Sequence, residues 1–473
     1  MSGRATDHKI ENQENVERQE FNGEFEDAAA VKVFVATKEH LPLSAEIAAM
    51  YEEALGKGGL KAEGHEAYPD PDLFSEAGIR STLESGERLI ALAKMQEGGD
   101  VIVGAMVADK MSPWHVEFNS MAVPIARRGN RIGSAIVAGL ADIIDQSLFT
   151  VNCTELVTHS LASQAAHFHN GFRAICGFGY CHYPHVFFKD HPESVLWVTR
   201  LQGKLIPSLK KFRSSLGRKL GKHALDVKHK LIAGQASGQV NLVAGRLDDQ
   251  SLSIVSEVLK ERTAYVPQRY NDLVQAILFQ FEDILDRTVK SYTRPEPNSE
   301  PGLETGLESG ADAITIDLKE GFAQSYLTFA PDFRFAADAI DNALAVVHSA
   351  ADREKRFIKV CLPANNPETL KAADYLNKKG FVFHSYLPLY GSGAATAPAG
   401  AGLQESDGEG LQTSVPEFYD VLSLQWIKPA VVKNNPMPGE TDSVIKLYGY
   451  PENLSGQILR TINREIHEST GDT

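Results

Sequence analysis

The sequence predicts an α/β (α+β) protein in which one arrangement of strands and helices occurs twice along the 473-residue chain. Three observations predict this class. Runs rich in β-forming residues alternate with helical patterns over residues 31–202. Between Trp114 and Leu140, a run that can form a strand passes through a tight basic turn into a helical pattern. Pieces of the first half then recur in the second half, which indicates an internal duplication.

Composition limits the class of protein further. The formal net charge is −15, which argues against nucleic acid as a general partner. No apolar run is long enough to span a bilayer, so we expect no transmembrane segment. Four cysteines are too few for a disulfide framework and favour a reducing, cytoplasmic location. Residues 1–29 are polar and acidic, with no apolar signal core, and are predicted to form a disordered tail.

The first half, residues 30–202, is predicted to form one domain. Its predicted strands are 31–37, 88–95, 101–111, 115–123, 155–158, 172–188 and 195–201, and its predicted helices are 44–55, about 132–146 and 162–169. The second and third strands are separated by the short turn Glu97–Asp100 and should form a hairpin.

The junction between the fourth strand and the following helix has the chemistry of an anion site. Arg128 and Arg131 are basic, and Gly129 and Gly133 let the backbone come close to a bulky phosphate. The first amide N–H groups of a helix have no partner within the helix, and the helix dipole favours negative charge there. A phosphate group is therefore the expected ligand of this turn.

The segment Arg128-Gly-Asn-Arg-Ile-Gly-Ser-Ala135 resembles the acetyl-CoA signature of the GNAT (Gcn5-related) N-acetyltransferases, Arg/Gln-x-x-Gly-x-Gly/Ala. The segment from Ser163 to Phe172 is similar to the end of the fourth helix in that family. The resemblance covers roughly residues 31–202. It implies a mixed, mostly antiparallel central sheet flanked by helices, and acetyl-CoA as co-substrate.

The resemblance also implies which residues hold acetyl-CoA. In the family the turn amides bind the pyrophosphate, and the preceding strand lies beside the pantetheine arm. The matching residues are Met121, Ala122 and Val123 on the strand and Arg128, Gly129, Asn130, Arg131, Ile132, Gly133 and Ser134 in the turn. Arg131 stands where the family usually has its first glycine. Its side chain could crowd the pyrophosphate or add a charge to it.

Acetyl transfer to an amine needs a base for the amine, donors for the developing oxyanion, and sometimes an acid for the thiolate. The resemblance assigns the donors to the backbone of Met121–Val123 and the base to Glu117, which is otherwise an exposed strand carboxylate. His167 stands where the family commonly has an acid tyrosine, and its ordinary pKa suits that role. Tyr180 is a rival acid, and the thiolate could also leave unassisted. The Cys and His residues between 159 and 185 match no closed zinc pattern, so no metal site is predicted.

Residues 203–235 are predicted to form a basic amphipathic linker helix. The stretch 204–231 carries nine Lys or Arg and one Asp, and its leucines recur at three- and four-residue steps. Such a helix can bridge two domains, or it can bind an anionic partner or a membrane surface.

The second half, residues 236–430, is predicted to be a degenerate GNAT-like domain. Residues 372–381 parallel residues 165–172, and an aromatic-rich strand follows in each copy. A strand at 262–266 and a helix at 270–285 parallel the opening strand and helix of the first half. The strand-to-helix junction from Asp332 to Asp338 lacks glycine and is acidic, so this copy is predicted to bind no coenzyme A.

Three further segments complete the predicted organisation of the second half. Flexible loops are predicted at 292–310 and 391–413, where Pro, Gly, Ala and Ser are frequent. Residues 431–473 are predicted to be a C-terminal extension that contains a helix.

The sequence favours an N-acetyltransferase that transfers an acetyl group, or another acyl group, from its CoA thioester directly to a primary amine. The acceptor, a small molecule or a peptide, stays open, as do acyl-chain preference and oligomeric state, a homo-oligomer included. The alternative is a non-catalytic protein of the same fold that senses acyl-CoA or scaffolds a partner. Only the enzyme should show turnover that depends on Glu117.

Overall fold

The computed structural model describes the sheet and helices of both halves of the chain. The described residues are 31–56, 68, 70–95, 101–112, 115–145, 151–158, 160–183, 193–201, 258, 260–282, 284–291, 313–319, 324–351, 357–393, 417–429 and 447–470. The predicted tail, the linker at 203–235 and the loop at 292–310 lie outside these residues, as does most of the loop predicted at 391–413.

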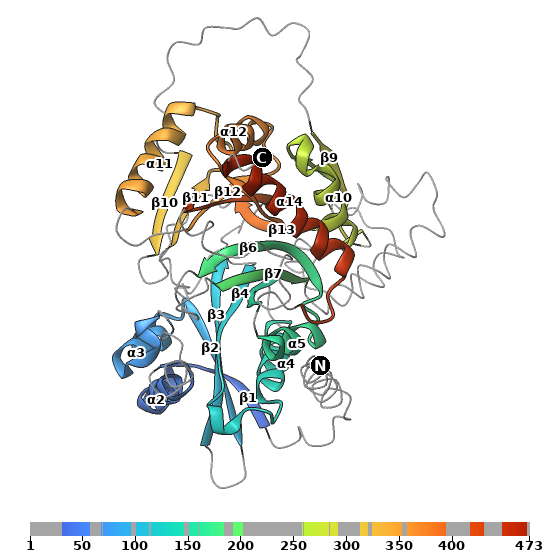
Figure 1. The fold of residues 1–473 in the computed structure, drawn as a ribbon. Coiled ribbons are helices and arrows are strands. Elements are labelled where there is room, and N and C mark those ends of the chain that lie inside the picture. The colour runs from blue at the N-terminus through green and yellow to red at the C-terminus, as the bar shows by residue number, and fades with distance from the viewer. Residues whose placement is uncertain are drawn as a thin grey trace, which may run out of the picture.

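One twelve-stranded sheet runs through both halves of the chain (Figure 1). The strand order is β1-β2-β3-β4-β5-β7-β6-β13-β14-β12-β11-β10. Only the pairs β4–β5 and β11–β12 are parallel in this sheet. A mixed, mostly antiparallel sheet with helices is therefore confirmed, and the two halves share it. A separate pair, β8–β9, is parallel.

The first half contains every predicted strand and helix, but β5 begins four residues before the strand predicted at 155–158. Its strands are β1 (Val31–Ala36), β2 (Arg88–Met95), β3 (Val101–Ser112), β4 (His115–Ala122), β5 (Val151–Val157), β6 (Ala174–Tyr183) and β7 (Glu193–Leu201). Its helices are α2 (Ser44–Leu55), α3 (Glu76–Ser85), α4 (Ile132–Ile144) and α5 (Leu161–His169). Helix α3 was not predicted. Ser75 begins it by accepting a hydrogen bond from the Gly78 amide at 3.1 Å, and Gly86 ends it with a φ of 65°.

The second half departs further from the predicted elements. Its strands are β8 (Arg262–Tyr265), β9 (Arg287–Lys290), β10 (Ile314–Lys319), β11 (Gln324–Phe329), β12 (Phe357–Pro363), β13 (Val382–Gly393) and β14 (Glu417–Ile427). Its helices are α10 (Asn271–Phe279), α11 (Ala337–Ala351), α12 (Glu368–Lys378) and α14 (Glu452–Thr470). The helix predicted to reach Leu285 ends at Phe279. Gly391 to Gly393, predicted to belong to a loop, pair with β14 instead.

Helices cover both faces of the first half (Figure 1). Helices α2 and α3 pack on one face of β2 and β3, through residues such as Ile47, Leu83 and Ile90. Helices α4 and α5 pack on the other face, through residues such as Ile136 and Ala166. Because successive side chains of a strand point to opposite faces, each strand of this region supplies apolar residues to both cores. None of the helices in the described ranges combines the length and the hydropathy needed to cross a bilayer.

The strand order has an internal symmetry that bears on the predicted duplication. The series β3-β4-β5-β7-β6 and β10-β11-β12-β14-β13 show the same succession of antiparallel, parallel, antiparallel and antiparallel pairs. The two series meet at β6 and β13, which pair at Gly177 and Ser385. In the second half, β8 and β9 are not part of the main sheet and pair with each other.

The middle of the sheet is strongly curved. The ring centroids of His115 on β4 and Tyr390 on β13 lie 4.3 Å apart, although these strands are four places apart. Lys359 Nζ on β12 lies 3.5 Å from the ring centroid of Trp197 on β7, also four places away. Four strand spacings span about 19 Å in a flat sheet. The face that carries these side chains is therefore concave, and it joins the two halves.

Candidate active site

The site is built on a bulge in β4. Ala105 of β3 pairs with Ala122 and Val107 pairs with Asn119, so three steps along β4 face two steps along β3. Ser120 takes a φ of 48° at this bulge, a left-handed conformation that a residue with a side chain rarely adopts. Its hydroxyl donates a hydrogen bond to the hydroxyl of Tyr68 at 3.2 Å.

Beyond the bulge, β4 and β5 separate. The two strands pair in parallel only from His115 to Phe118 on β4, although β4 continues to Ala122 and β5 to Val157. The backbone of Met121 to Val123 therefore lies at the point of divergence. This is where the resemblance expects the pantetheine arm and the thioester carbonyl.

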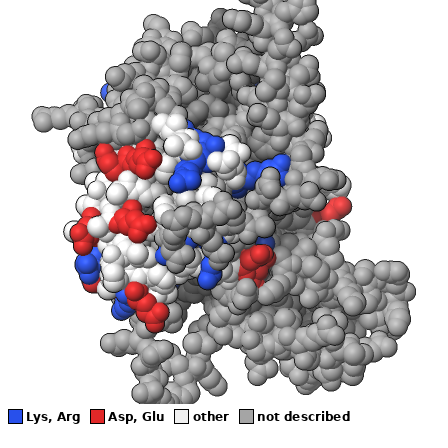
Figure 2. All heavy atoms as spheres, turned by 90° about the horizontal axis from the view of Figure 1, so that it is seen from below, with Lys and Arg blue, Asp and Glu red and all other residues white. Residues whose placement is uncertain are grey.

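A short basic turn follows β4. Within it, η4 (Ile125–Arg127) leads to Arg128, whose Nε donates to the Val123 carbonyl at 3.2 Å. Asn130 Nδ2 donates to the Arg127 carbonyl at 3.3 Å. Gly129 has a φ of 83°, a conformation that glycine adopts without strain. The side chains of this turn are exposed. In the view from below (Figure 2), Lys or Arg and Asp or Glu side chains both occur on the described surface.

The first turn of α4 is open to a ligand. Its first helical hydrogen bond runs from the Ala135 amide to the Arg131 carbonyl at 3.0 Å, and no side chain in the described ranges caps the helix. The amides of Ile132, Gly133 and Ser134 precede that bond. They can therefore donate to an anion, which the helix dipole also favours.

Two contacts fix this turn in place. A Cβ added at Gly133 would lie 3.3 Å from Met121 Sδ, so the helix start sits tightly against the bulged strand. Asn170 Nδ2, after α5, donates to the Ser134 carbonyl at 3.2 Å and to its Oγ at 3.3 Å. The residues present fit a pyrophosphate because open amides, glycines and arginines converge here.

Arg131 has a left-handed backbone conformation, which a residue with a side chain rarely adopts. It is the N-cap residue of α4, with φ 55° and ψ 15° in the left-handed region. This conformation costs a residue with a side chain about 1–2 kcal/mol relative to the right-handed one. Its side chain is exposed. Of the two effects considered for Arg131, added charge fits this geometry better than crowding.

Glu117 lies on the concave face of the sheet, three residues before Ser120. It is half-buried and pairs with Cys153 across β4 and β5. Its charge contributes, together with burial and other acidic groups, to the raised pKa of the Tyr326 and Tyr390 hydroxyls. Both tyrosines come from the second half. The structure therefore brings the predicted base together with residues of the second half that the sequence had not indicated.

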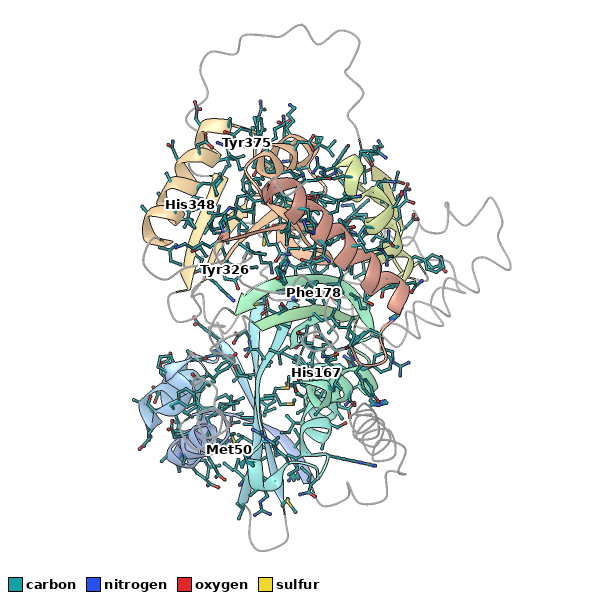
Figure 3. All side chains as sticks on the ribbon, viewed as in Figure 1. Met50, His167, Phe178, Tyr326, His348 and Tyr375 are labelled. Atoms are coloured by element: carbon teal, nitrogen blue, oxygen red, sulfur yellow. The ribbon has the colours of Figure 1, made fainter. Side chains whose placement is uncertain are left out.

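His167 lies on the other side of the sheet (Figure 3). Its ring contacts Phe172, which packs against Phe118, and Phe118 points away from Glu117. Burial lowers its pKa to about 4, despite a hydrogen bond between Nδ1 and the Ser163 carbonyl at 2.9 Å. That bond requires a proton on Nδ1, so Nε2 carries none at neutral pH. This geometry argues against His167 as the acid for the thiolate.

Tyr180, the rival acid, lies in the packing between the halves. Its side chain is buried in the hydrophobic core, and its amide donates to Gln425 Oε1 of β14 at 3.0 Å. Tyr68 was missed as a site residue, although it is the tyrosine that contacts the bulge. The only signal for it was its place in the Pro- and Asp-rich segment between the first helix and the hairpin.

The corresponding junction in the second half holds a pocket of about 630 Å³, lined by residues 331–335, 365–368 and 371. The Phe335 amide, just before α11, donates to Glu368 Oε2 at 3.3 Å. Asn366 Nδ2 donates to the carbonyls of Pro331 and Phe333 at 3.1 and 2.7 Å. Glu368 thus bonds to the residue two positions before α11, while the amides of Ala337–Ala339 precede the first helical bond, which runs from the Ile340 amide to the Ala336 carbonyl. Glu368 would also repel a phosphate.

The comparisons with known proteins give structural matches only. No protein-family model matches the sequence, and no curated protein matches it. Solved structures of acetyltransferases match over about a third of the chain. A ribosomal-protein-S5-alanine acetyltransferase from Vibrio fischeri is 11% identical, with a TM-score of 0.31, covering 38% of this chain and 96% of its own.

Two further matches have the same character. A ribosomal-protein-alanine N-acetyltransferase from Brucella melitensis is 20% identical, with a TM-score of 0.29, covering 36% of this chain and 99% of its own. A GNAT superfamily phosphinothricin acetyltransferase from Sinorhizobium meliloti, in complex with AcCoA, is 18% identical, with a TM-score of 0.28, covering 37% and 90%. At such identities and scores, activity has to be argued from the site itself.

Proposed function

We propose that the protein is an N-acyltransferase that transfers an acetyl group from acetyl-CoA to a primary amine. The observation that carries this proposal is the open start of α4 next to a bulged strand that separates from β5. The amides of Ile132–Ser134 would bind the pyrophosphate, with Arg128 and Arg131 adding positive charge. The backbone of Met121–Val123 would lie beside the thioester.

In the proposed reaction the amine nitrogen attacks the thioester carbonyl carbon. A C–N bond forms, the C–S bond breaks, and the proton lost by the amine is balanced by the one gained by the thiol of coenzyme A. Glu117, directly or through a water, would accept the amine proton. Backbone N–H groups near Met121 would stabilise the developing oxyanion. We assign no acid for the thiolate, because His167 is neutral with its proton on Nδ1 and Tyr180 is buried in the core.

We further propose a tandem arrangement in which the second half is a degenerate copy without a coenzyme site. The repeated strand order supports the duplication, and Glu368 on the Phe335 amide supports the loss of the site. Calorimetric titration with acetyl-CoA should then show one site per chain. Two equivalent sites would contradict the degeneracy.

The test of the coenzyme site is Gly133→Val. The new side chain would meet Met121 at the helix start, and we expect acetyl-CoA affinity to fall at least about tenfold, or 1.4 kcal/mol. Gly456→Val is the matched control, because this glycine lies in α14 and its nearest neighbour is the end of the flexible Arg460 side chain. Equal affinity of Gly133→Val and wild type would refute the assignment.

The alternative is a non-catalytic acyl-CoA binder, which the neutral, buried His167 favours because it leaves the site without the acid that its position suggested. Turnover separates the two functions. For the enzyme, Glu117→Gln should lower kcat about 10²- to 10⁴-fold, the usual effect of a general base, and leave acetyl-CoA binding in place. An acyl-CoA binder would show no amine-dependent release of coenzyme A in either form.

A further inference from the structure

The concave face of the sheet holds a cationic side chain from the second half. Lys359, on β12, is 1% exposed. Its Nζ lies 3.5 Å from the ring centroid of Trp197 and within 6.0 Å of the ring centroids of Tyr326 and Tyr390. Among the described residues, no carboxylate lies within ion-pair distance of this ammonium group. Burying an ammonium group without a hydrogen-bonded anion costs free energy, so the presence of Lys359 at this position needs an explanation.

The pairing of the strands places Lys359 on the same face as Glu117. Paired residues of neighbouring strands point to the same face, and Lys359 pairs with Tyr326 and with Gln425. Glu117 pairs with Cys153, and both lie on that same face in the first half of the curved sheet. Lys359 in turn lowers the pKa of His115, which burial alone already depresses, to about 3. The two halves thus contribute opposite charges to one concave surface.

Two buried N–H donors lie beside this lysine. Trp197 Nε1 and His115 Nδ1 are buried and make no hydrogen bond in the described part of the chain. His115 Nε2 lies 3.0 Å from Cys153 Sγ, and burial raises the pKa of that thiol well above its ordinary value. The protonated thiol therefore donates to Nε2, which leaves the ring proton on Nδ1. Tyr326, whose ring lies near Lys359 Nζ, is labelled in Figure 3 at the level where the two halves meet.

The three groups share one property: the ammonium of Lys359, the indole N–H of Trp197 and the Nδ1–H of His115 are all donors. A ligand that only accepts hydrogen bonds and carries negative charge would satisfy them, and a carboxylate does both. A phosphate, with nearly two charges, would meet stronger repulsion from Glu117 and Glu155. A carboxylate therefore fits these three donors better than a phosphate does.

We propose that the acyl acceptor is an amine that also bears a carboxylate, with the carboxylate bound by Lys359, Trp197 and His115 and the amine directed towards Glu117. This inference rests on the proposed acyltransferase function and names its class of acceptor. It also gives the second half a part in the reaction, because Lys359 selects the substrate while the first half carries the coenzyme site.

The geometry sets the length of the acceptor. Six residues separate His115, which would bind the carboxylate, from Met121 beside the thioester site, or about 20 Å along an extended strand, and Glu117 lies between them. After allowance for the bulge and the side chains, the amine and the carboxylate are on the order of 10 Å apart. α-Amino acids are too short to span this distance, whereas a short peptide or a long ω-amino acid can do so.

The experiment uses ω-amino carboxylates of increasing chain length, from glycine to 12-aminododecanoate, each paired with its carboxamide. Release of coenzyme A from acetyl-CoA is measured with the full-length protein. We expect kcat/KM to peak near 8-aminooctanoate and to exceed that of its amide about 10- to 100-fold, the discrimination of a charged hydrogen bond. A tripeptide and its C-terminal amide then show whether a peptide serves as the source of the carboxylate.

Variants test the role of the lysine. Lys359→Met should bring the ratio of carboxylate to amide close to one, and Lys359→Arg should retain part of the preference. Lys378→Met, an exposed lysine on α12, is the matched control and should keep the wild-type ratio. Equal kcat/KM for acid and amide in the wild type overturns the inference, whether or not a variant folds.

The two proposals fail in different ways. Absence of acetyl-CoA binding by the wild type refutes the proposed function. If acetyl-CoA binds and amines are acetylated without regard to a carboxylate, only the acceptor class is wrong. If the protein loaded with acetyl-CoA neither binds nor acetylates any carboxylate of the series, the inference is likewise overturned.

Discussion

At the scale of single residues, substitutions of Arg131 can separate the effect of its charged side chain from the effect of its left-handed backbone conformation. The helix start needs a left-handed residue, and Arg131 supplies it with a φ of 55°. Arg131→Gly should therefore keep acetyl-CoA binding within about tenfold and raise the free energy of unfolding by up to about 1 kcal/mol. Arg131→Val, whose branched side chain disfavours this conformation, should lose binding by more than tenfold.

Titration with acetyl-CoA at low and high salt measures the two effects in these variants. If Arg131→Gly abolished binding as completely as Arg131→Val, the guanidinium rather than the backbone would be the essential group. A loss that disappears at high salt would indicate that Arg131 acts by screened charge alone.

The residue scale also shows what a sequence can and cannot indicate about a site. The turn from Arg128 to Ser134 is local, so glycines, arginines and a following helix pattern were sufficient to predict its geometry. Lys359 is different, because it lies in an ordinary strand and acquires its surroundings only when β12 curves towards β7. No local pattern could associate it with Trp197, which is 162 positions away.

At the scale of elements, a helix end that has local sequence signals can be predicted, whereas one that depends on contacts with distant residues cannot. Helix α3 has a serine N-cap and a left-handed glycine at its end, so the sequence contained the signals that could have predicted it. The early end of α10 had no such signal. Gln280, the next residue, turns its side chain to the backbone of Ile175 on β6, at 2.7 Å and 3.0 Å. This contact between the halves accompanies the end of the predicted helical pattern.

A buried ion pair helps to attach the small β8–β9 sheet to the rest of the molecule. Arg287 on β9 donates to both carboxylate oxygens of Asp420 on β14, at 2.7 and 3.2 Å. Tyr386 and the Leu389 amide also donate to Asp420. Asp420→Asn should lower the free energy of unfolding by about 3–5 kcal/mol, because it leaves a buried guanidinium without its counter-charge. Asp374→Asn, an exposed change on α12, is the control.

The same pair predicts a pH dependence. Burial alone would raise the pKa of Asp420, but Arg287 and the hydrogen bonds outweigh it and hold the pKa below its ordinary value. The stabilisation is thus present above the unfolded-state pKa of about 3.9 and is lost as pH falls through the lower folded-state pKa. In urea denaturation, the difference between wild type and Asp420→Asn should shrink below about pH 4. A difference that stayed constant to pH 2 would contradict this assignment.

At the scale of the whole molecule, the two halves are joined more by side chains than by strand pairing. Strands β6 and β13 pair only at Gly177 and Ser385, where a Cβ on the glycine would lie 2.2 Å from Ser385 Cβ. Beside this point, the side chains of two glutamines form hydrogen bonds with the backbone of β6, as a neighbouring strand would. Gln280 bonds to the backbone of Ile175. Gln425 accepts from the Tyr180 amide and donates to the Phe178 carbonyl.

We expect these glutamines to make the halves unfold as one unit. Replacing either by leucine leaves buried backbone groups unpaired, at about 1–3 kcal/mol each. The double variant Gln280→Leu/Gln425→Leu should therefore lower the free energy of unfolding by roughly 2–6 kcal/mol. In scanning calorimetry its single transition should broaden or divide into two, because the shared core alone then links the halves.

Gln268→Leu provides the control, since this glutamine is exposed in η6 (Gln268–Tyr270) and should leave the transition unchanged. The same variants also bear on the acceptor. If the junction positions Lys359 against Trp197, loosening it should reduce the preference for a carboxylate before it affects acetyl-CoA affinity, because the coenzyme site lies within the first half. A double variant that kept both the single transition and the full acceptor preference would show that the glutamines do not hold the halves together.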